Sequence, residues 1–155
     1  MFREIRRKDR ILDESSAWNL LRNNEYGFLA MCGANGYGYS VPLNYVLDND
    51  RLYFHCAPEG FKLDSLAENN KVSFTVVGRT NVVPGKFTTE YESTLVFGKI
   101  EMDLPEEERR YALGLILDKY SPEFKKTGMV YIEQSFHRTN ILRLNIEHIS
   151  GKCRK

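Results

Sequence analysis

The spacing of apolar residues predicts a helix close to the start of the chain. Ala17, Leu20 and Leu21 fall on one face of a helix with a period of about 3.6 residues. Asp13 precedes this stretch, and acidic residues in a first turn favour a helix start. The pattern therefore predicts a helix over about residues 13–24.

A second helix is predicted over about residues 105–120. Pro105 and three glutamates open the segment, apolar positions such as Tyr111 and Leu115 share one side, and Pro122 follows its end. Residues 123–139 carry a weaker pattern that predicts another short helix.

Most of the remaining chain alternates between apolar and polar residues with a period of two, which is typical of β-strands. Turn signals such as Asn35-Gly36 separate the first of these segments. Gly98 interrupts a strand pattern and predicts a bulge or a close approach of two backbones. The expected strands are "YGFLAMCG", "YSVPLNYVL", "LYFHCA", residues 72–77, residues 91–102 and a last strand from Ile141, with a loop over residues 78–86.

These segments predict a mainly β fold of about six antiparallel strands with flanking helices, closed or split into a barrel. A length of 155 residues favours a single domain over residues 1–155. Such a small barrel has little interior room, so we expect a ligand on its outside or at a subunit junction.

Charge argues against a polyanionic partner. The chain has 22 Lys and Arg and 21 Asp and Glu, a net charge of +1, which predicts binding neither to nucleic acid nor to an anionic membrane surface. The basic run Arg6–Arg10 is either a solvated arm or a functional feature. No stretch reaches the ~18 apolar residues that span a bilayer.

The three cysteines indicate a reducing compartment. Cys32, Cys56 and Cys153 are odd in number, widely spaced and without a supporting histidine cluster. This pattern predicts neither a disulfide framework nor a metal site, and it favours a cytoplasmic location.

The stretch "YFHCAPEGFKLDSLAENN" places unusual chemistry at one corner between a strand and a helix. The strand carries His55 and Cys56, Gly60 relaxes the backbone, and a helix beginning near Phe61 offers unpaired N–H groups beside Lys62. An anion such as a phosphate fits this arrangement. The alternative is an ordinary corner with a solvated lysine.

Three residues in this region allow two readings each. Pro42 lies within a strand pattern, so its strand is either a plain sheet edge or a strand whose backbone hydrogen-bonds a ligand ring. His55 suits acid–base chemistry at neutral pH, but no triad surrounds it, and a packed histidine is the alternative. Cys56 is either reactive or a buried structural cysteine.

Five blocks carry a resemblance to a known family: "RRKDR" from Arg6, "GFLAMCGANGYGYSVPLNYV" from Gly27, "LYFHCAPEGFKLDSLAENNKVSF" from Leu52, "YESTLVFGKIE" from Tyr91 and "ISGK" from Ile149. In this order they resemble the flavin-binding split-barrel proteins related to pyridoxamine 5′-phosphate oxidase, and most closely their nitroimidazole-resistance-like branch. No single block is specific, whereas the ordered set is.

The resemblance implies a six-stranded antiparallel split barrel that forms a homodimer, with FMN in each of two grooves between the subunits. The oxidase has an arginine at the position of Phe61, so one partner of the phosphate is missing here. The implied cofactor-binding residues are Ser40, Val41, Pro42, Leu43, Asn44, Tyr45, His55, Cys56, Phe61, Lys62 and, from the second subunit, Ser93.

The resemblance also implies an activity. The C-terminal arginine and tryptophan motif with which the oxidase binds pyridoxal has no counterpart in "LRLNIEHISGKCRK", which argues against oxidation of pyridoxamine phosphate. The expected function is an FMN-dependent oxidoreductase that reduces a small aromatic or nitro compound, with His55 as the catalytic residue. The alternative is a non-catalytic module that binds or stores flavin or haem.

Overall fold

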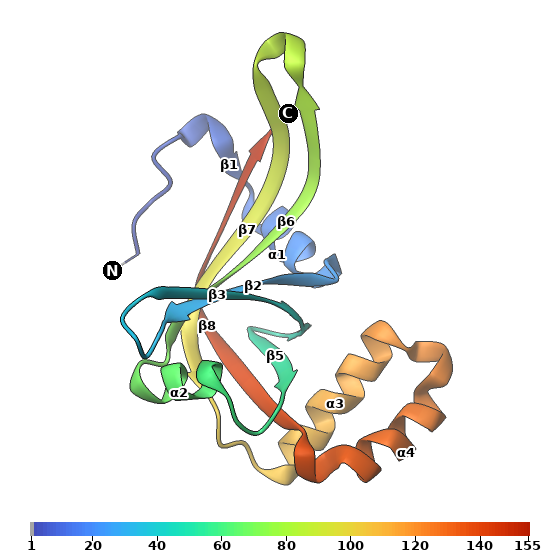
Figure 1. The fold of residues 1–155 in the computed structure, drawn as a ribbon. Coiled ribbons are helices and arrows are strands. Elements are labelled where there is room, and N and C mark those ends of the chain that lie inside the picture. Colours follow the sequence, from blue (N-terminus) through green and yellow to red (C-terminus); the bar gives the residue numbers. More distant parts are fainter. Residues whose placement is uncertain (1) are drawn as a thin grey trace.

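One antiparallel sheet forms the body of the protein in the computed structural model, which describes residues 2–155 (Figure 1). Its strands follow the order β3-β2-β6-β7-β8-β5-β4, and the short β1 pairs with β8. The sheet curls into a half-barrel. The strands are β1 (Ile11–Leu12), β2 (Tyr26–Cys32), β3 (Gly38–Asn44), β4 (Val46–Asp48), β5 (Arg51–Cys56), β6 (Lys71–Val83), β7 (Thr88–Glu101) and β8 (Asn140–Arg154).

The predicted mainly β class is confirmed, but the sheet has eight strands rather than six. One reason is that "YSVPLNYVL" forms two strands, which separate at Tyr45. The side chain of Tyr45 is fully buried, and the hydroxyl of Tyr120 hydrogen-bonds both its backbone N–H, at 3.0 Å, and its carbonyl, at 2.9 Å. The other reason is the two-residue β1, which is too short for a periodic signal.

The loop predicted over residues 78–86 is wrong. β6 runs on to Val83, and only Pro84–Lys86 form the turn before β7. The register shifts between Val77 and Thr80 and then continues from Thr80 opposite Tyr91. Pairing with β7 supplies the backbone hydrogen bonds that the composition of this segment did not predict. The resulting hairpin projects from the body of the protein (Figure 1).

The helices begin and end close to the predicted positions. Asp13 caps α1 by accepting a hydrogen bond from the Ser16 amide at 2.9 Å. Relative to the predicted 13–24, α1 is one residue shorter at each end, and α3 begins one residue after Pro105. The helices are α1 (Glu14–Asn23), α2 (Phe61–Glu68), α3 (Glu106–Tyr120) and α4 (Lys125–Ser135).

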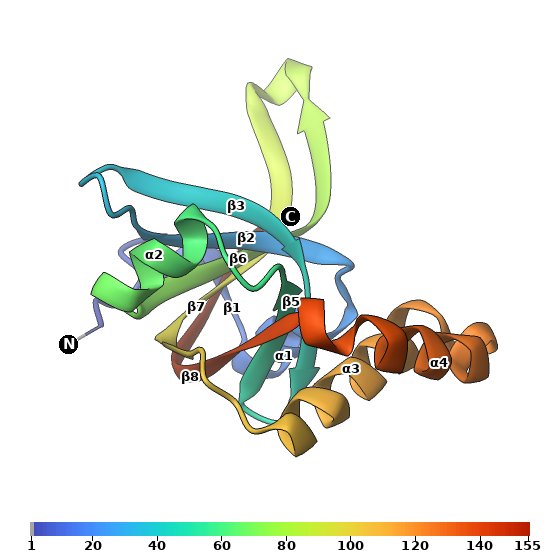
Figure 2. The ribbon, with the colours of Figure 1, turned by 60° about the horizontal axis from the view of Figure 1, so that its bottom comes forward.

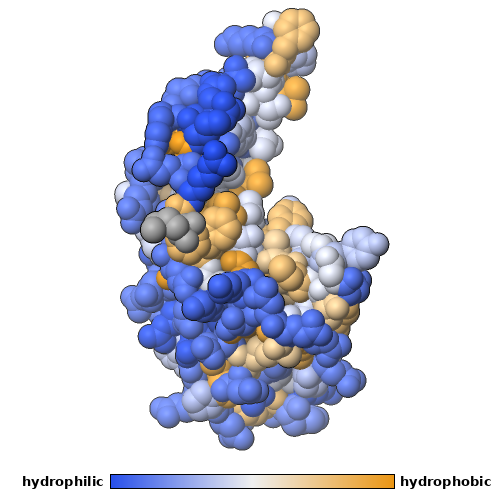
Figure 3. All heavy atoms as spheres, turned by 90° about the vertical axis from the view of Figure 1, so that its left-hand side faces the viewer, coloured by the Kyte–Doolittle hydropathy of each residue, from blue (hydrophilic) through white to orange (hydrophobic). Residues whose placement is uncertain are grey.

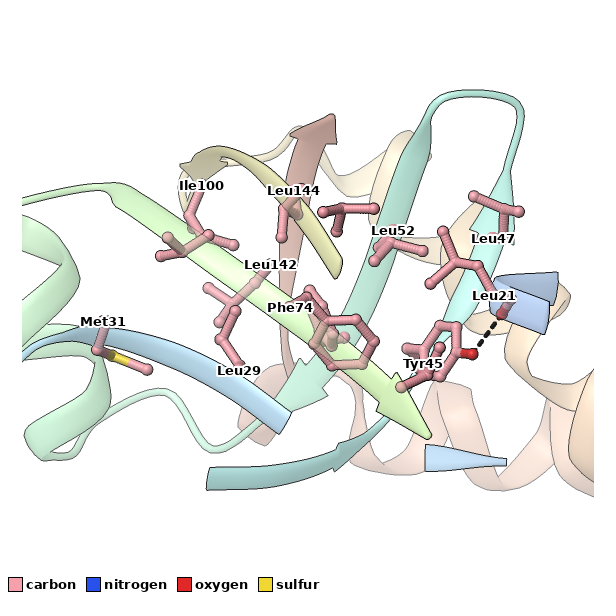
Figure 4. Packing of buried hydrophobic residues seen from close by; sticks show 14 of the residues in the cluster. Leu21, Leu29, Met31, Tyr45, Leu47, Leu52, Phe74, Ile100, Leu142 and Leu144 are labelled. Carbon is pink, nitrogen blue, oxygen red and sulfur yellow. Dashed lines mark hydrogen bonds between the residues drawn. The ribbon is translucent and has the colours of Figure 1, made fainter. Parts of the chain in front are cut away.

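Two hydrophobic clusters hold these elements together. The larger lies inside the curled sheet beneath α1, where Leu21, Leu29 and Phe74 are fully buried (Figure 4). The smaller lies between the sheet and the α3–α4 pair, which sits at one end of the molecule (Figure 2). No helix within residues 2–155 has both the length and the apolar content to cross a membrane.

Gly98 confirms the predicted irregularity of its strand. The register between β7 and β8 shifts between Phe97 and Gly98. A Cβ atom added to Gly98 would lie 2.1 Å from the carbonyl oxygen of Asn145, so the two backbones approach closely at this point. Because β8 has one extra residue here, its side chains switch faces of the sheet across the bulge. The bulge therefore decides which side chains of β8 point outward.

Candidate functional site

The predicted corner between a strand and a helix is present. β5 ends at Cys56, and α2 begins at Phe61 after Gly60, which has a φ of 140°. The amides of Leu63 and Asp64 hydrogen-bond the Gly60 carbonyl, at 3.0 and 3.1 Å. The amides of Phe61 and Lys62 belong to the first turn, where the helix offers no acceptor. They are the donors available to a ligand.

Gly60 leaves this corner open. A positive φ of this size favours glycine, and no atom lies within 4 Å of where a Cβ would be. The buried Ser65 anchors the helix start, because its hydroxyl accepts from the Ala34 amide at 3.0 Å and donates to the Phe61 carbonyl at 2.8 Å. The space beside Gly60, at the start of α2, is therefore open.

Lys62 lies close enough to His55 and Cys56 to influence both electrostatically. Partial burial lowers the pKa of His55, and Lys62 lowers it further, although the imidazole still reaches solvent. Burial raises the pKa of the Cys56 thiol, against the opposing effect of Lys62. At neutral pH the corner therefore holds a neutral imidazole, a thiol and one ammonium group. Asp64 adds a negative charge in the same helical turn.

Pro42 lies on an edge strand, because β3 ends the sheet next to β2. Ser40, Pro42 and Asn44 are exposed, whereas Val41 and Leu43 point toward the core and are half-buried. A proline is tolerated here because one side of the strand has no partner that needs its N–H.

The edge strand and the corner are in direct contact. The rings of Tyr39 on β3 and Phe61 on α2 meet edge to face, with centroids 4.9 Å apart. The structure thus brings β3 against the corner that holds His55, Cys56, Phe61 and Lys62. Tyr39 makes this contact but was not among the predicted site residues.

Tyr45 does not belong to this surface. Its side chain is fully buried, and its hydroxyl donates a hydrogen bond to the carbonyl of Leu21 (Figure 4). Its own carbonyl accepts from Lys119 at 2.8 Å and from Tyr120 at 2.9 Å. Since no group of Tyr45 is left for a ligand, we exclude it from the proposed site.

Ser93 lies away from the corner within one subunit. It is on β7, opposite Val77 on β6 and Lys152 on β8. His55 at the corner pairs with Ile141 on β8, eleven residues along the strand from Lys152, and this stretch of strand spans about 35 Å. A ligand at the corner of one subunit therefore requires a second copy of the chain if it is also to contact Ser93.

Comparison with known structures places the half-barrel and its flanking helices among the split barrels. A putative 5-nitroimidazole antibiotic resistance protein from Bacteroides thetaiotaomicron aligns with a TM-score of 0.75 and 25% identity, and the alignment covers 92% of this chain and 85% of that chain. A FAD-binding protein from Mesorhizobium loti aligns with a TM-score of 0.69 and 24% identity, and the alignment covers 94% of this chain and 98% of that chain. A flavocytochrome from Azotobacter vinelandii aligns with a TM-score of 0.76 and 22% identity, and the alignment covers 92% of this chain and 68% of that chain.

The family follows from the sequence match. The model of the pyridoxamine 5′-phosphate oxidase family matches residues 13–153, and the chain belongs to that family. No curated protein matches it. The solved structures that are 24% and 22% identical to this chain support only the assignment of the fold. The flavins that their names mention are ligands of those proteins.

Proposed function

We propose that the chain binds FMN as a homodimer and uses it to reduce a small aromatic or nitro compound in the cytoplasm. The observation that carries this proposal is the corner itself. It combines open first-turn amides with Lys62 and a neutral His55, in contact through Phe61 with an exposed edge strand. An anion site beside a strand with free backbone groups suits a phosphate attached to a flat, amide-rich ring.

The corner gives a phosphate hydrogen-bond donors and access, but only one cation. The amides of Phe61 and Lys62 and the ammonium group of Lys62 provide two or three charge-assisted hydrogen bonds, each worth about 1.5–3 kcal/mol. Phe61 cannot replace the oxidase's arginine, because its side chain carries neither a charge nor a hydrogen-bond donor, and its ring packs on Tyr39. Asp64 further reduces the local positive charge. One subunit therefore holds the phosphate with a single cation.

The edge strand suits the ring system of the cofactor. Its exposed positions Ser40, Pro42 and Asn44 alternate with core-facing residues, so one side of β3 offers backbone groups and small side chains to a ligand. Ser93 would reach the ring from the second copy, since in its own subunit it lies about 35 Å along β8 from the corner. The homodimer is thus part of the proposed site.

His55 is the candidate catalytic residue. When FMN is bound, it supplies the electron transfer, and the protein supplies orientation and hydrogen bonds. Burial and Lys62 keep the imidazole neutral at pH 7, so it donates one hydrogen bond through its N–H and accepts one through its other nitrogen. This ability to orient an acceptor such as a nitro group is what we propose for His55.

Binding of the cofactor is tested with Lys62→Ala. Loss of one charge-assisted contact should weaken FMN binding by about 10- to 100-fold, measured by quenching of flavin fluorescence. Lys99→Ala is the matched control, because Lys99 is an exposed lysine on β7 that pairs with Glu147 at 3.5 Å. Equal losses in the two variants would show that the phosphate does not lie at the corner.

Turnover is tested separately. FMN-loaded protein reduced by NADH, by NADPH or chemically should pass electrons to members of a panel of nitro compounds and quinones, and His55→Gln should slow this step without releasing FMN. A protein that keeps FMN but reduces none of the acceptors would support the non-catalytic alternative. A monomeric mass with FMN bound would contradict the shared site.

A further inference from the structure

The N-terminal arm lies across the outer side of β7 and β8. The ring of Phe2 stacks on His148, with centroids 4.9 Å apart, and on Phe97 at 5.3 Å. At the other end of the arm, Ile11 on β1 pairs with Lys152 on β8. Figure 1 shows the arm beside these strands. The arm that carries the basic run Arg6–Arg10 is therefore anchored to the sheet at both ends, while most side chains of the run remain exposed.

A shallow cavity of about 730 Å³, wide open to solvent, lies between the arm, the β6–β7 hairpin and the end of β8. Four cationic side chains line it, Arg7 and Arg10 from the arm and Lys152 and Arg154 from β8, and none of its lining residues is acidic. Figure 3 shows strongly hydrophilic side chains gathered on this side of the molecule, beside the projecting hairpin. The two ends of the chain thus build one basic hollow in a protein whose net charge is only +1.

Most of this positive charge has no counter-charge in the protein. Asp9 is the nearby carboxylate, 2.6 Å from Arg7 and 3.4 Å from Arg10, and one carboxylate balances only one of the two. Among residues 2–155, no carboxylate lies within ion-pair distance of Lys152 or Arg154. Like charges gathered without partners favour a bound anion.

The acidic side chains nearest to Arg154 are engaged elsewhere. Glu90 and Glu92 share a neighbouring hollow with Arg154. Glu90 accepts a hydrogen bond from the Asn81 side chain at 3.0 Å, and Glu92 accepts one from the Arg79 amide at 3.3 Å. Both flank Tyr91 on β7, so their side chains leave the opposite face of the sheet and are not among the residues that line the cavity.

Aromatic residues border the same cavity. Tyr91 lies opposite Arg154 in the β7–β8 register, so their side chains share one face of the sheet. Phe87, at the tip of the hairpin, is 98% exposed and adopts a left-handed conformation with a φ of 51°. An exposed phenylalanine in this conformation costs stability, and such strain is found at ligand sites.

We propose that this cavity binds an oxyanion, a phosphate or a carboxylate, carried on a flat ring, with the cations holding the anion and Phe87 and Tyr91 contacting the ring. The anion comes either from a free ring-bearing acid or from the phosphate of a flavin bound across a dimer. The second source rests on the proposed function, and it would provide the cations that the corner beside Phe61 lacks. Ser93, which faces Lys152 across the strands, places the cavity next to the position proposed to contact the partner's flavin.

The test uses the full chain free of flavin, with calorimetric titration of phenyl phosphate, benzoate, inorganic phosphate, FMN and riboflavin. The double variant Lys152→Gln with Arg154→Gln, called the strand variant below, should weaken phenyl phosphate binding at least ~10-fold, because two charge-assisted contacts are lost. The control, Lys71→Gln with Lys126→Gln, removes the same charge from exposed sites outside the cavity. Arg7→Gln, in the arm and outside the sheet, is the second variant if the strand variant folds poorly.

The FMN titrations identify the source of the anion. If the strand variant loses phenyl phosphate and keeps FMN, the ligand is a separate acid. If it loses FMN but binds riboflavin as before, the ligand is the flavin's phosphate. A protein that binds phenyl phosphate but no FMN would refute the proposed function and leave this inference standing. The inference would be overturned if the wild-type protein bound neither phenyl phosphate nor benzoate. It would also be overturned if the control variant lost as much affinity for phenyl phosphate as the strand variant.

The variant Phe87→Gly tests the contact with the ligand's ring separately from the contact with its anion. Glycine relieves the left-handed conformation, so the variant should be at least as stable as the wild type. Its affinity for phenyl phosphate should fall several-fold, whereas its affinity for inorganic phosphate should not change. A parallel loss of both ligands, or of neither, would contradict the role given to Phe87.

Discussion

Replacing Gly98 by alanine should destabilise the protein strongly, although it adds only one methyl group. The new Cβ would lie 2.1 Å from the carbonyl oxygen of Asn145 and 2.8 Å from a methyl group of Leu144. Ordinary contacts of this kind begin at about 3.4 Å. The nearest atom belongs to the backbone of β8, and it cannot rotate away as a flexible side chain would.

The expected cost follows from this overlap. Forcing an extra methyl group into a packed site costs about 1–3 kcal/mol, and rigid backbone places Gly98→Ala at the upper end of that range. For a chain of 155 residues, each 1 kcal/mol lowers the Tm by about 2–4 °C. The variant should therefore melt about 6–12 °C below the wild type.

The assay is thermal unfolding followed by circular dichroism, with wild type and variants free of flavin so that ligand does not shift the Tm. Gly85→Ala is the matched control, because nothing lies within 4 Å of its added Cβ at the hairpin tip. This control should melt within about 2 °C of the wild type or slightly above it. If Gly98→Ala and Gly85→Ala melt together, the close approach of β7 and β8 is not as described.

Three further changes test other parts of the fold by urea denaturation. Asp13→Ala removes the cap on the Ser16 amide and should cost about 1 kcal/mol, whereas an unchanged midpoint would argue against the cap. Glu108→Gln should cost about 1–3 kcal/mol, because it removes the negative charge that pairs with Arg143 at 2.5 Å. Burial acts to raise the pKa of Glu108, but its contacts with Arg143 and Tyr53 together outweigh burial and lower the pKa below its ordinary value of 4.5. The contribution to stability is therefore complete above pH 4.5, and the difference from wild type should shrink as the pH falls further. Gly114→Ala should stabilise α3 by about 0.5–1 kcal/mol, since its Cβ meets no atom within 4 Å, and a loss of stability would show a hidden contact.

Local signals in the sequence were enough to predict the helices and several special positions. Asp13 and Pro105 mark helix starts because capping and a fixed φ act within one turn. Pro42 predicted an edge strand as one of two readings, and Gly98 predicted an irregular strand, since each residue restricts its own backbone. The corner with Gly60 and Lys62 was predicted for the same reason: its parts are neighbours along the chain.

The sequence did not predict features that depend on pairing between distant segments. The extension of β6 to Val83 exists because β7 provides its hydrogen bonds, and the separation of β3 from β4 exists because the core and Tyr120 hold Tyr45. Neither effect has a period or a motif that a local pattern can detect.

The sequence by itself determined a mainly β chain with two clear helices and a corner suited to an anion, because those features arise from neighbouring residues. Only the tertiary structure joined Phe61 to Tyr39, buried Tyr45 and brought the basic run of the N-terminal arm to Lys152 and Arg154. These contacts join segments far apart in the chain, and the curl of the sheet and the pairing of β1, β7 and β8 decide them.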